Sequence, residues 1–320
     1  EIMHLKRFAL TIVDEASQIL EPSIIGLLAI VGKFILIGDI KQLPAVVQQS
    51  ATDSAVSEPR LIEIGLTDCR NSLFERMIRH TAKHHSAASA QPLIATLRRQ
   101  GRMHPDIAAW PNSMFYRDEK MMPVPLPHQQ EQSMSYNALP ADRLDQLITE
   151  HRMLFIDVKP EGDGRDSKSN SAEAKLCADI IRRIRRMAAN CWNPKKTVGV
   201  IVPYRNQISL IRQEIERLCG TEDAAEITID TVERYQGSQR DIIIYSFTVS
   251  QPHQLEFLAA STFTAQPIDG KPYLVDRKLN VALTRARKQM IMLGNSHLLR
   301  RNTLFRNLID ATAININEKP

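Results

Sequence analysis

The sequence has few of the residues that mark metal-binding, low-complexity or disulfide-rich proteins. Its 320 residues include only four cysteines, at positions 69, 177, 191 and 219, with no CxxC pair among them. This spacing indicates neither a zinc site nor an iron–sulfur cluster, and the cysteines are expected to be reduced thiols in a cytoplasmic protein. The sequence has only 12 glycines and 5% aromatic residues, which argues against a low-complexity chain and against a β-sandwich.

The hydrophobic runs are too short to cross a membrane. The longest, Ile24–Ile37, is interrupted by Lys33 and falls short of the roughly 18 residues that a spanning helix needs. It divides better into a helix over Ser23–Val31 and a strand over Lys33–Ile37. The sequence therefore predicts no membrane partner.

Size and charge favour a protein of two domains. With 320 residues and 43% hydrophobic content, the chain has enough apolar side chains for two cores. Lysine and arginine together number 41, against 36 aspartate and glutamate residues, which gives a formal net charge of +5. This mild excess permits nucleic-acid binding without demanding it.

Polar residues follow two apolar runs near the start of the chain. Asp14 and Glu15 come directly after the run Phe8–Val13, and the segment GDIKQLP, which includes Gln42, comes directly after Phe34–Ile37. Parallel α/β sheets hold ligands at the carboxyl ends of their strands. There Asp14 can hold the Mg²⁺ that bridges nucleotide phosphates, Glu15 can polarise an attacking water, and Gln42 can touch that water and the γ-phosphate. An isolated Asp-Glu pair would instead fit a solvated turn with a helix cap.

Four further segments follow in one order along the chain. They are LRRQGRMHP (97–105), VGVIVPYRNQ (198–207), TVERYQGSQRDIIIYS (231–246) and LNVALTRARK (279–288). With the two segments above, this set resembles the motifs of superfamily 1 helicases, in the subgroup that includes the nonsense-mediated-decay RNA helicase and the DNA-replication nuclease-helicases. The resemblance runs from about Phe8 to Asn295. It implies an α/β fold of two RecA-like P-loop NTPase domains with parallel sheets, which use ATP and Mg²⁺.

The resemblance also implies domain limits. Residues 1–93 would complete a first RecA-like domain, 94–310 would form the second, and 311–320 would be a C-terminal tail. The polar, Ala/Ser-rich stretch His80–Gln91 is expected to link the domains or to form a loop near their junction. The stretch Met121–Pro140, rich in Pro, Gln and Ser, is expected to be a surface loop.

The phosphate-binding loop of the family is missing from this sequence. In the family, a Gly-rich turn ending in Gly-Lys-Ser/Thr precedes the Asp-Glu strand, whereas the nearest match here, Gly26–Lys33, has the wrong spacing and continues into Phe34. We therefore expect the first domain to be truncated at its N-terminus. The chain, which begins at Glu1, is interpreted as the C-terminal part of a longer helicase that on its own does not hydrolyse ATP.

The resemblance assigns residues of the later segments to the nucleotide. Arg102 and Arg285 correspond to two arginines that reach the γ-phosphate, where a guanidinium stabilises the charge of the transferring phosphoryl group. Gly237 and Gln239 fall in a nucleotide-binding segment, but Gln239 replaces the family's usual Glu, which contacts the ribose. Gln still donates and accepts hydrogen bonds, so altered nucleotide discrimination is expected.

Residues at two other strand ends are assigned to the nucleic acid. Thr231, after the strand Ile227–Ile229, matches a position that touches the nucleic-acid backbone, and Tyr204 and Arg205 follow another strand end. Contacts to phosphates carry no sequence preference. Tyr204 fits ordinary packing at a helix start equally well.

A predicted helix over Ala172–Ala188 carries a cluster of arginines. Its apolar residues share one face and leave four arginines largely outside it: Arg182, Arg183, Arg185 and Arg186. This cluster fits a solvated helix face at least as well as a nucleic-acid patch.

His104 and Pro105 fit a structural turn better than a catalytic pair, because hydrolysis of Mg²⁺-NTP needs no histidine.

The sequence therefore favours an ATP-dependent superfamily 1 helicase or translocase. The resemblance implies a monomer that moves 5′ to 3′ on single-stranded nucleic acid, and DNA is favoured over RNA. Two alternatives stay open, an RNA or ribonucleoprotein remodelling ATPase and a non-catalytic nucleic-acid-binding scaffold. The missing phosphate loop and Gln239 motivate the scaffold. The intact catalytic residues argue against it, since a chain free of catalytic demand has no reason to keep them together.

Overall fold

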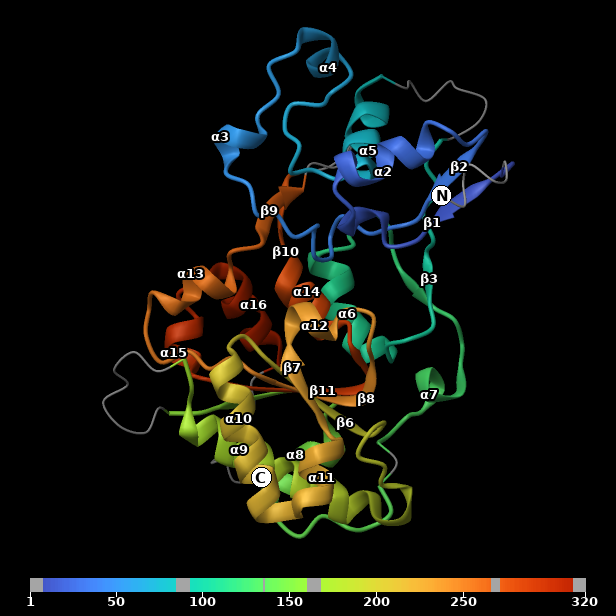
Figure 1. Ribbon diagram of the computed structural model, residues 1–320. Coiled ribbons are helices and arrows are strands. Elements are labelled where there is room, and N and C mark those ends of the chain that lie inside the picture. Colours follow the sequence, from blue (N-terminus) through green and yellow to red (C-terminus); the bar gives the residue numbers. More distant parts are fainter. Residues whose placement is uncertain (1–7, 85–92, 135, 160–167, 266–270, 313–320) are drawn as a thin grey trace. The chain divides into compact units, whose positions relative to one another are not determined.

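The chain folds into two compact units. The computed structural model describes residues 8–84, 93–134, 136–159, 168–265 and 271–312 (Figure 1). The first unit takes in the described residues up to Thr96, and the second takes in those from Leu97 onward. Within the described residues, no helix is both long enough and apolar enough to cross a membrane.

The first unit contains a short parallel sheet and several helices. Its elements are β1 (Thr11–Val13), η1 (Ala16–Gln18), α2 (Glu21–Leu28), β2 (Phe34–Leu36), α3 (Ala51–Ser54), α4 (Pro59–Glu63) and α5 (Leu73–His84). β1 and β2 pair in parallel, with Thr11 opposite Phe34 and Val13 opposite Leu36. α2 packs against α5, and Arg76 joins the two helices through a bidentate ion pair with Glu21.

Two sequence predictions for this unit need correction. The helix predicted over Ser23–Val31 begins earlier, at Glu21, because Pro22 suits its first turn, and it ends at Leu28. The predicted link His80–Gln91 is wrong in its first part, since α5 continues through His84. α5 packs on α2, and its polar composition over residues 80–84 does not end the helix. The rest of that stretch lies outside the described residues.

The second unit is larger and contains the main sheet. Its first elements are β3 (Arg99–Gln100), α6 (Pro105–Met114), β4 (Met122–Pro123), α7 (Pro127–Gln130), α8 (Arg143–Glu150), β5 (Met153–Asp157), α9 (Ser171–Ala188), η2 (Ala189–Cys191), β6 (Val198–Val202), α10 (Arg205–Cys219) and α11 (Thr221–Glu226). They are followed by β7 (Thr228–Thr231), α12 (Val232–Tyr235), β8 (Arg240–Ser246), α13 (Gln254–Leu258), β9 (Thr262–Ala265), β10 (Tyr273–Asp276), α14 (Arg277–Leu283), β11 (Ala286–Gly294), α15 (Ser296–Leu299) and α16 (Thr303–Thr312).

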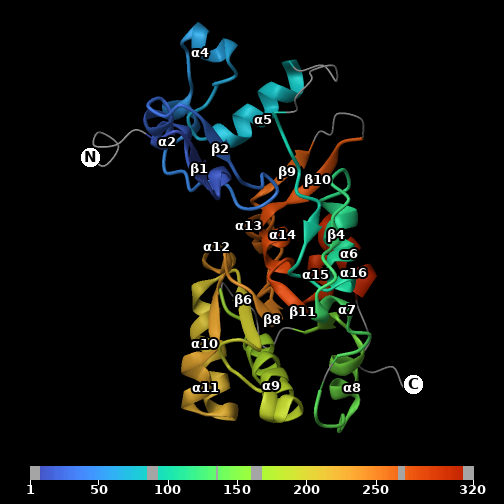
Figure 2. The same ribbon diagram turned by 90° about the vertical axis from the view of Figure 1, so that its right-hand side faces the viewer.

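The main sheet has five parallel strands in the order β5-β11-β8-β6-β7. Strands of a parallel sheet with helices on both faces read as continuous apolar runs, and Val198–Val202 is buried along its whole length. α9 and α10 lie on one side of the sheet, and α6 and α16 lie on the other (Figure 2). This arrangement confirms the predicted α/β fold with a parallel sheet.

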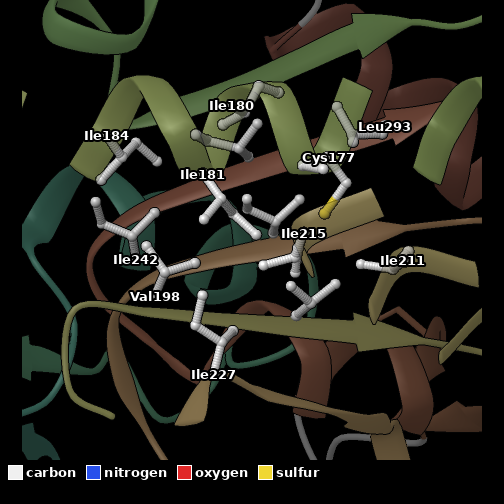
Figure 3. Packing of buried hydrophobic residues seen from close by; sticks show 14 of the residues in the cluster. Cys177, Ile180, Ile181, Ile184, Val198, Ile211, Ile215, Ile227, Ile242 and Leu293 are labelled. Carbon is white, nitrogen blue, oxygen red and sulfur yellow. The ribbon is translucent and has the colours of Figure 1, made fainter. Parts of the chain in front are cut away.

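Alternate residues of each strand enter two separate cores. On the α9 side, Cys177, Ile181 and Ile184 point toward strand residues such as Val198 and Ile242 (Figure 3). On the other side, aromatic rings of β8, of α16 and of Phe247, which follows β8, meet, with the ring centroids of Phe247 and Phe305 5.6 Å apart and those of Tyr245 and Phe247 4.3 Å apart. The sheet is therefore enclosed between two helical layers, which fixes the positions of its strand ends.

Several sequence predictions for this unit are confirmed. The strand β6 ends directly before Pro203, and α10 begins two residues later. The predicted helix Ala172–Ala188 is α9, whose apolar face is buried.

The stretch Met121–Pro140, predicted to be a surface loop, is a loop only in part, because β4 and α7 interrupt it. Pro127 occupies the first turn of α7, where its missing N–H costs nothing.

Candidate functional site

The Asp14–Glu15 pair forms a tight turn at the end of β1. Glu15 adopts the left-handed backbone conformation, with φ 51° and ψ 35°, which is uncommon for a residue other than glycine. Its backbone N–H donates to Oδ1 of Asp14 at 2.9 Å, and Gln18 Nε2 donates to Oε2 of Glu15 at 2.6 Å. Both acidic residues are exposed. The turn thus presents two carboxylates at the carboxyl end of a strand.

Backbone pairing continues past β1 and β2 and holds the two strand ends together. Ile37 N donates to Val13 O, and Ala16 N donates to Ile37 O, both at 2.8 Å. The next residue is Gly38, where an added Cβ would meet Ser17 N at 3.0 Å and the ring of Phe74 at 3.1 Å. Glycine at this position therefore permits the close approach of the β2 end to the turn after β1.

Asp39 organises the loop that carries Gln42. Its carboxylate accepts from Gln42 Nε2 at 3.0 Å and from the backbone N–H of Lys41 at 2.8 Å. Gln42 N also donates to Asp39 O at 3.2 Å. Sequence reasoning selected Gln42 but missed this role of Asp39, which follows from the Asp-x-x-Gln spacing of a turn in which the carboxylate accepts from later N–H groups.

The metal-binding prediction rests on one carboxylate. Among the residues that the structure describes, no group of three or more His, Cys, Asp or Glu side chains could hold a metal ion. Mg²⁺ is commonly bound by one or two carboxylates together with substrate phosphates and water. Asp14, an exposed carboxylate at a strand end, fits a Mg²⁺ ion of that kind and does not form a closed metal site.

In the second unit, Arg102 brings three of the sequence segments together. Its Nε donates to Oε1 of Gln239 at 3.1 Å, and its Nη1 donates to the carbonyl oxygen of Thr284 at 3.2 Å. The backbone N–H of Arg102 donates to Oε1 of Gln100 at 3.0 Å. Arg102 thus hydrogen-bonds both to Gln239, which is also assigned to the nucleotide, and to Thr284, the residue before Arg285.

Arg285 lies buried two residues after the end of α14. Only 2% of it is exposed, and its guanidinium donates to Val281 O and to Thr284 Oγ1, both at 3.0 Å. The guanidinium is therefore held against the last turn of α14, which precedes it in the chain. Gly237 has φ +83° with nothing within 4 Å of an added Cβ, so its left-handed backbone, and not lack of space, favours glycine there.

The three residues assigned to the nucleic acid line one hollow. Thr231, Tyr204 and Arg205 border a cavity of about 460 Å³, together with Lys168, Glu233, Arg234 and Phe257. The Tyr204 ring stacks on that of Phe257, with centroids 4.9 Å apart and planes 20° apart. Burial raises the pKa of the Tyr204 phenol, which keeps it neutral. Tyr204 therefore both packs at a helix start and borders the hollow.

Sequence reasoning missed two residues beside this hollow, Phe257 and Lys278. Lys278 Nζ lies 4.2 Å from the centre of the Phe257 ring and 3.2 Å from Oε1 of Glu233. Burial opposes ionisation of Glu233, but a backbone N–H and Lys278 outweigh it and hold the Glu233 pKa below its usual value. No motif includes Phe257, and its short helix, which also contains Gln254 and Glu256, carries no signal that could have drawn attention to it.

The register of the sheet places these two groups of residues at opposite ends. Gln239 and Arg285 directly precede β8 and β11, whose first residues pair with each other. Tyr204 follows β6, and Thr231 ends β7 opposite Val202. The residues assigned to the nucleotide thus lie at the amino ends of the strands, and those assigned to the nucleic acid lie at the carboxyl ends.

The arginines of α9 are paired with aspartates of the same unit. The ion pairs are Arg182–Asp179, Arg183–Asp142, Arg183–Asp145, Arg183–Asp179, Arg185–Asp223 and Arg186–Asp145. Each guanidinium already has a carboxylate partner, which favours the solvated helix face over a nucleic-acid patch.

His104 has a structural position. It directly precedes α6, and its Nδ1 accepts from Asp106 N at 3.2 Å.

Comparison with known proteins relates the chain to helicases. An AAA-domain family model matches residues 69–297, and another AAA-domain model matches residues 1–50. The chain is 30% identical over 308 residues to the DNA replication ATP-dependent helicase/nuclease DNA2 of Xenopus laevis, covering 90% of this chain and 25% of that protein. It is 28% identical over 308 residues to Regulator of nonsense transcripts 1 of Dictyostelium discoideum, covering 95% of this chain and 20% of that protein.

A solved structure of Arterivirus nonstructural protein 10, a helicase, aligns with a TM-score of 0.39 at 14% identity, covering 95% of this chain and 41% of that one. The chain spans a quarter or less of the length of the two curated relatives named above.

Proposed function

Because the chain belongs to the AAA-domain family, and within it to the superfamily 1 helicases, we propose that it couples ATP hydrolysis to movement along single-stranded nucleic acid. The observation that most supports this proposal is the contact of Arg102 with Gln239 and with the carbonyl oxygen beside Arg285. These residues come from segments far apart in the sequence, yet they meet at one end of the sheet. A cluster of this kind is what phosphoryl transfer requires of a protein, since the chemistry depends on positioned positive charge.

We assign the phosphate chemistry to both units. In the first, Asp14 would hold Mg²⁺, which neutralises phosphate charge when bound. Glu15, on the adjacent position of the same turn, would orient and polarise the attacking water. Gln42, fixed by Asp39, would contact that water and the γ-phosphate. We also propose that residues 1–93 belong to one RecA-like domain and that residues 94–310 form a second.

In the second unit, Arg102 and Arg285 would stabilise the charge on the transferring phosphoryl group. Gly237 and Gln239 would contact the nucleotide. Arg285 donates to Val281 O and to Thr284 Oγ1, so engagement of a phosphate would replace these two neutral acceptors with a charged one, which gives stronger hydrogen bonds. That exchange would make the arginine position depend on whether the γ-phosphate is present, which is the basis of a switch.

We propose that Thr231, Tyr204 and Arg205 bind the strand. Their shared hollow is bordered by exposed cations, as expected for contacts to a phosphate backbone. We further propose DNA as the preferred polymer, 5′ to 3′ movement and a monomeric protein. An RNA or ribonucleoprotein remodelling ATPase is the second candidate, since one relative is a regulator of nonsense transcripts.

ATP hydrolysis by the full-length protein, with single-stranded DNA, single-stranded RNA or neither, tests this function. We expect one polymer to stimulate turnover. Glu15→Gln should lower the stimulated rate at least about 100-fold through loss of the general base, and Arg285→Ala at least about 1,000-fold through loss of phosphate stabilisation. Glu58→Gln and Arg217→Ala, at exposed positions of the two units, are the matched controls and should leave the rate unchanged.

The polymer that stimulates turnover decides between DNA and RNA. Stimulation by RNA alone would reject the DNA preference and favour remodelling of RNA. Binding of either polymer without stimulated turnover would reject the ATPase and leave a nucleic-acid-binding scaffold.

A further inference from the structure

Phe257 is an aromatic residue that the core does not need. It lies in α13, between β8 and β9, outside all six motif segments. Its neighbours Leu255 and Leu258 turn inward and are 8% and 3% exposed, whereas Phe257 is 44% exposed. A large apolar ring that faces solvent beside a hollow lined by charged side chains loses nothing in packing when it binds a ligand. Its position therefore calls for an explanation outside the core.

The ring of Phe257 is held in a fixed orientation. It stacks on Tyr204, which is itself only 8% exposed and anchored at the start of α10. Lys278 approaches the ring to 4.2 Å and is restrained by its ion pair with Glu233. Despite both contacts, nearly half of the residue stays open to solvent. A preoriented ring binds a flat ligand with little loss of conformational freedom.

Three exposed cations border the same hollow as this ring. Lys168, Arg205 and Arg234 all line the cavity that Phe257 borders, and all three are exposed. Arg234 has a carboxylate 3.7 Å away, on Asp230, a distance that leaves the pair weak. Sites for single strands combine such cations, which track the phosphates, with an aromatic face on which a base stacks.

We propose that Phe257 is a stacking contact for one base of a bound single strand: Tyr204, stacked on the ring, orients it, and the base takes the place over the ring that the Lys278 ammonium occupies here. This inference rests on the proposed nucleic-acid binding and extends it to a residue that no motif contains. Because every base has a π face, the contact adds affinity without selecting a sequence. Phosphates on either side of the stacked base would meet the cations of the hollow.

The test is an anisotropy titration of the chain with fluorescent oligothymidine and with an abasic oligomer of the same length, which keeps the phosphates but lacks the bases. Phe257→Leu keeps an apolar side chain and removes the aromatic face; it should weaken oligothymidine binding about tenfold and leave abasic binding unchanged. Phe257→Trp keeps a stacking face and should retain wild-type affinity. Arg234→Gln should weaken binding of both oligomers and reduce the salt dependence.

The failures of this inference and of the proposed function are distinguishable. Equal affinity of wild type and Phe257→Leu for oligothymidine, or equal loss on both oligomers, overturns the stacking role while nucleic-acid binding stands. Absence of binding by the wild type to oligothymidine and to oligouridine overturns the proposed function, and the stacking role falls with it. The Leu and Trp variants both keep an apolar side chain, and equal thermal unfolding of the two excludes a folding defect as the cause.

Discussion

Glu173 makes the stability of the second unit depend on pH. This carboxylate is fully buried near the start of α9, where it accepts from Ser246 Oγ at 2.6 Å, from Thr248 N at 2.8 Å and from Asn170 Nδ2 at 3.0 Å. Gln207 of α10 joins the same network through Ser246 and Asn170. Burial raises the pKa of Glu173 to about 7 from 4.5, although the hydrogen bonds from Ser246 and Thr248 oppose the rise.

The sign of the effect follows from proton binding in the two states. Below about pH 4.5 the carboxyl group is protonated both folded and unfolded, so its contribution to stability is fully present. As the pH rises from 4.5 to about 7, the folded state holds the proton more tightly than the unfolded state, and the free energy of unfolding falls. The whole shift corresponds to about 3 kcal/mol, and the loss is complete above the folded pKa.

The substitution Glu173→Gln removes the titrating proton while keeping the side-chain volume. The difference in unfolding free energy between wild type and this variant should therefore change by about 3 kcal/mol between about pH 4.5 and pH 8. Both tryptophans, Trp110 and Trp192, lie in the second unit, so urea unfolding followed by their fluorescence reports the relevant transition. Glu222→Gln, at an exposed position of α11, is the matched control. A difference that stays constant with pH would refute the reasoning.

Two further substitutions test separate parts of the structure. Gly38→Ala should cost the first unit about 1–3 kcal/mol, because an added Cβ would meet a backbone nitrogen of η1 at 3.0 Å. Gly26→Ala, inside α2 with open space around it, should instead raise stability by up to about 1 kcal/mol; equal amide hydrogen exchange in the two variants would contradict this. Replacing Arg182 and Arg185 with Gln should leave the affinity for oligothymidine unchanged, since aspartates already pair with them. If the loss of affinity, measured by anisotropy, is as large as that caused by Arg234→Gln, the arginines of α9 do bind nucleic acid.

The sequence predicted those features that depend on local pattern. Apolar runs located β1, β2 and β6, Pro203 predicted the break before α10, and the helical spacing of apolar residues located α9 to within one residue. In each case, neighbouring residues along the chain determine the element. The same local reasoning found the polar residues that follow the strands.

Features that depend on contacts between distant residues could not be predicted in this way. The hydrogen bond from Arg102 to Gln239 joins residues far apart in the chain, and the approach of Lys278 to Phe257 depends on the packing of α13 and α14. The end of α5 was also missed, because the polar stretch that suggested a loop continues the helix to His84. Tyr204 follows the carboxyl end of a strand, as local pattern predicts, whereas Arg285 precedes a strand.

One short connection runs from one end of the main sheet to the other. Residues 231–239 leave β7 at its carboxyl end and enter β8 at its amino end, a separation of about 20 Å for the strand lengths involved. Glu233 and Arg234, at one end of this connection, border the hollow, and Gln239, at the other, holds Arg102. A connection this short over such a span is nearly fully extended. A displacement of α12 by a bound strand would therefore shift Gln239 and, through it, Arg102.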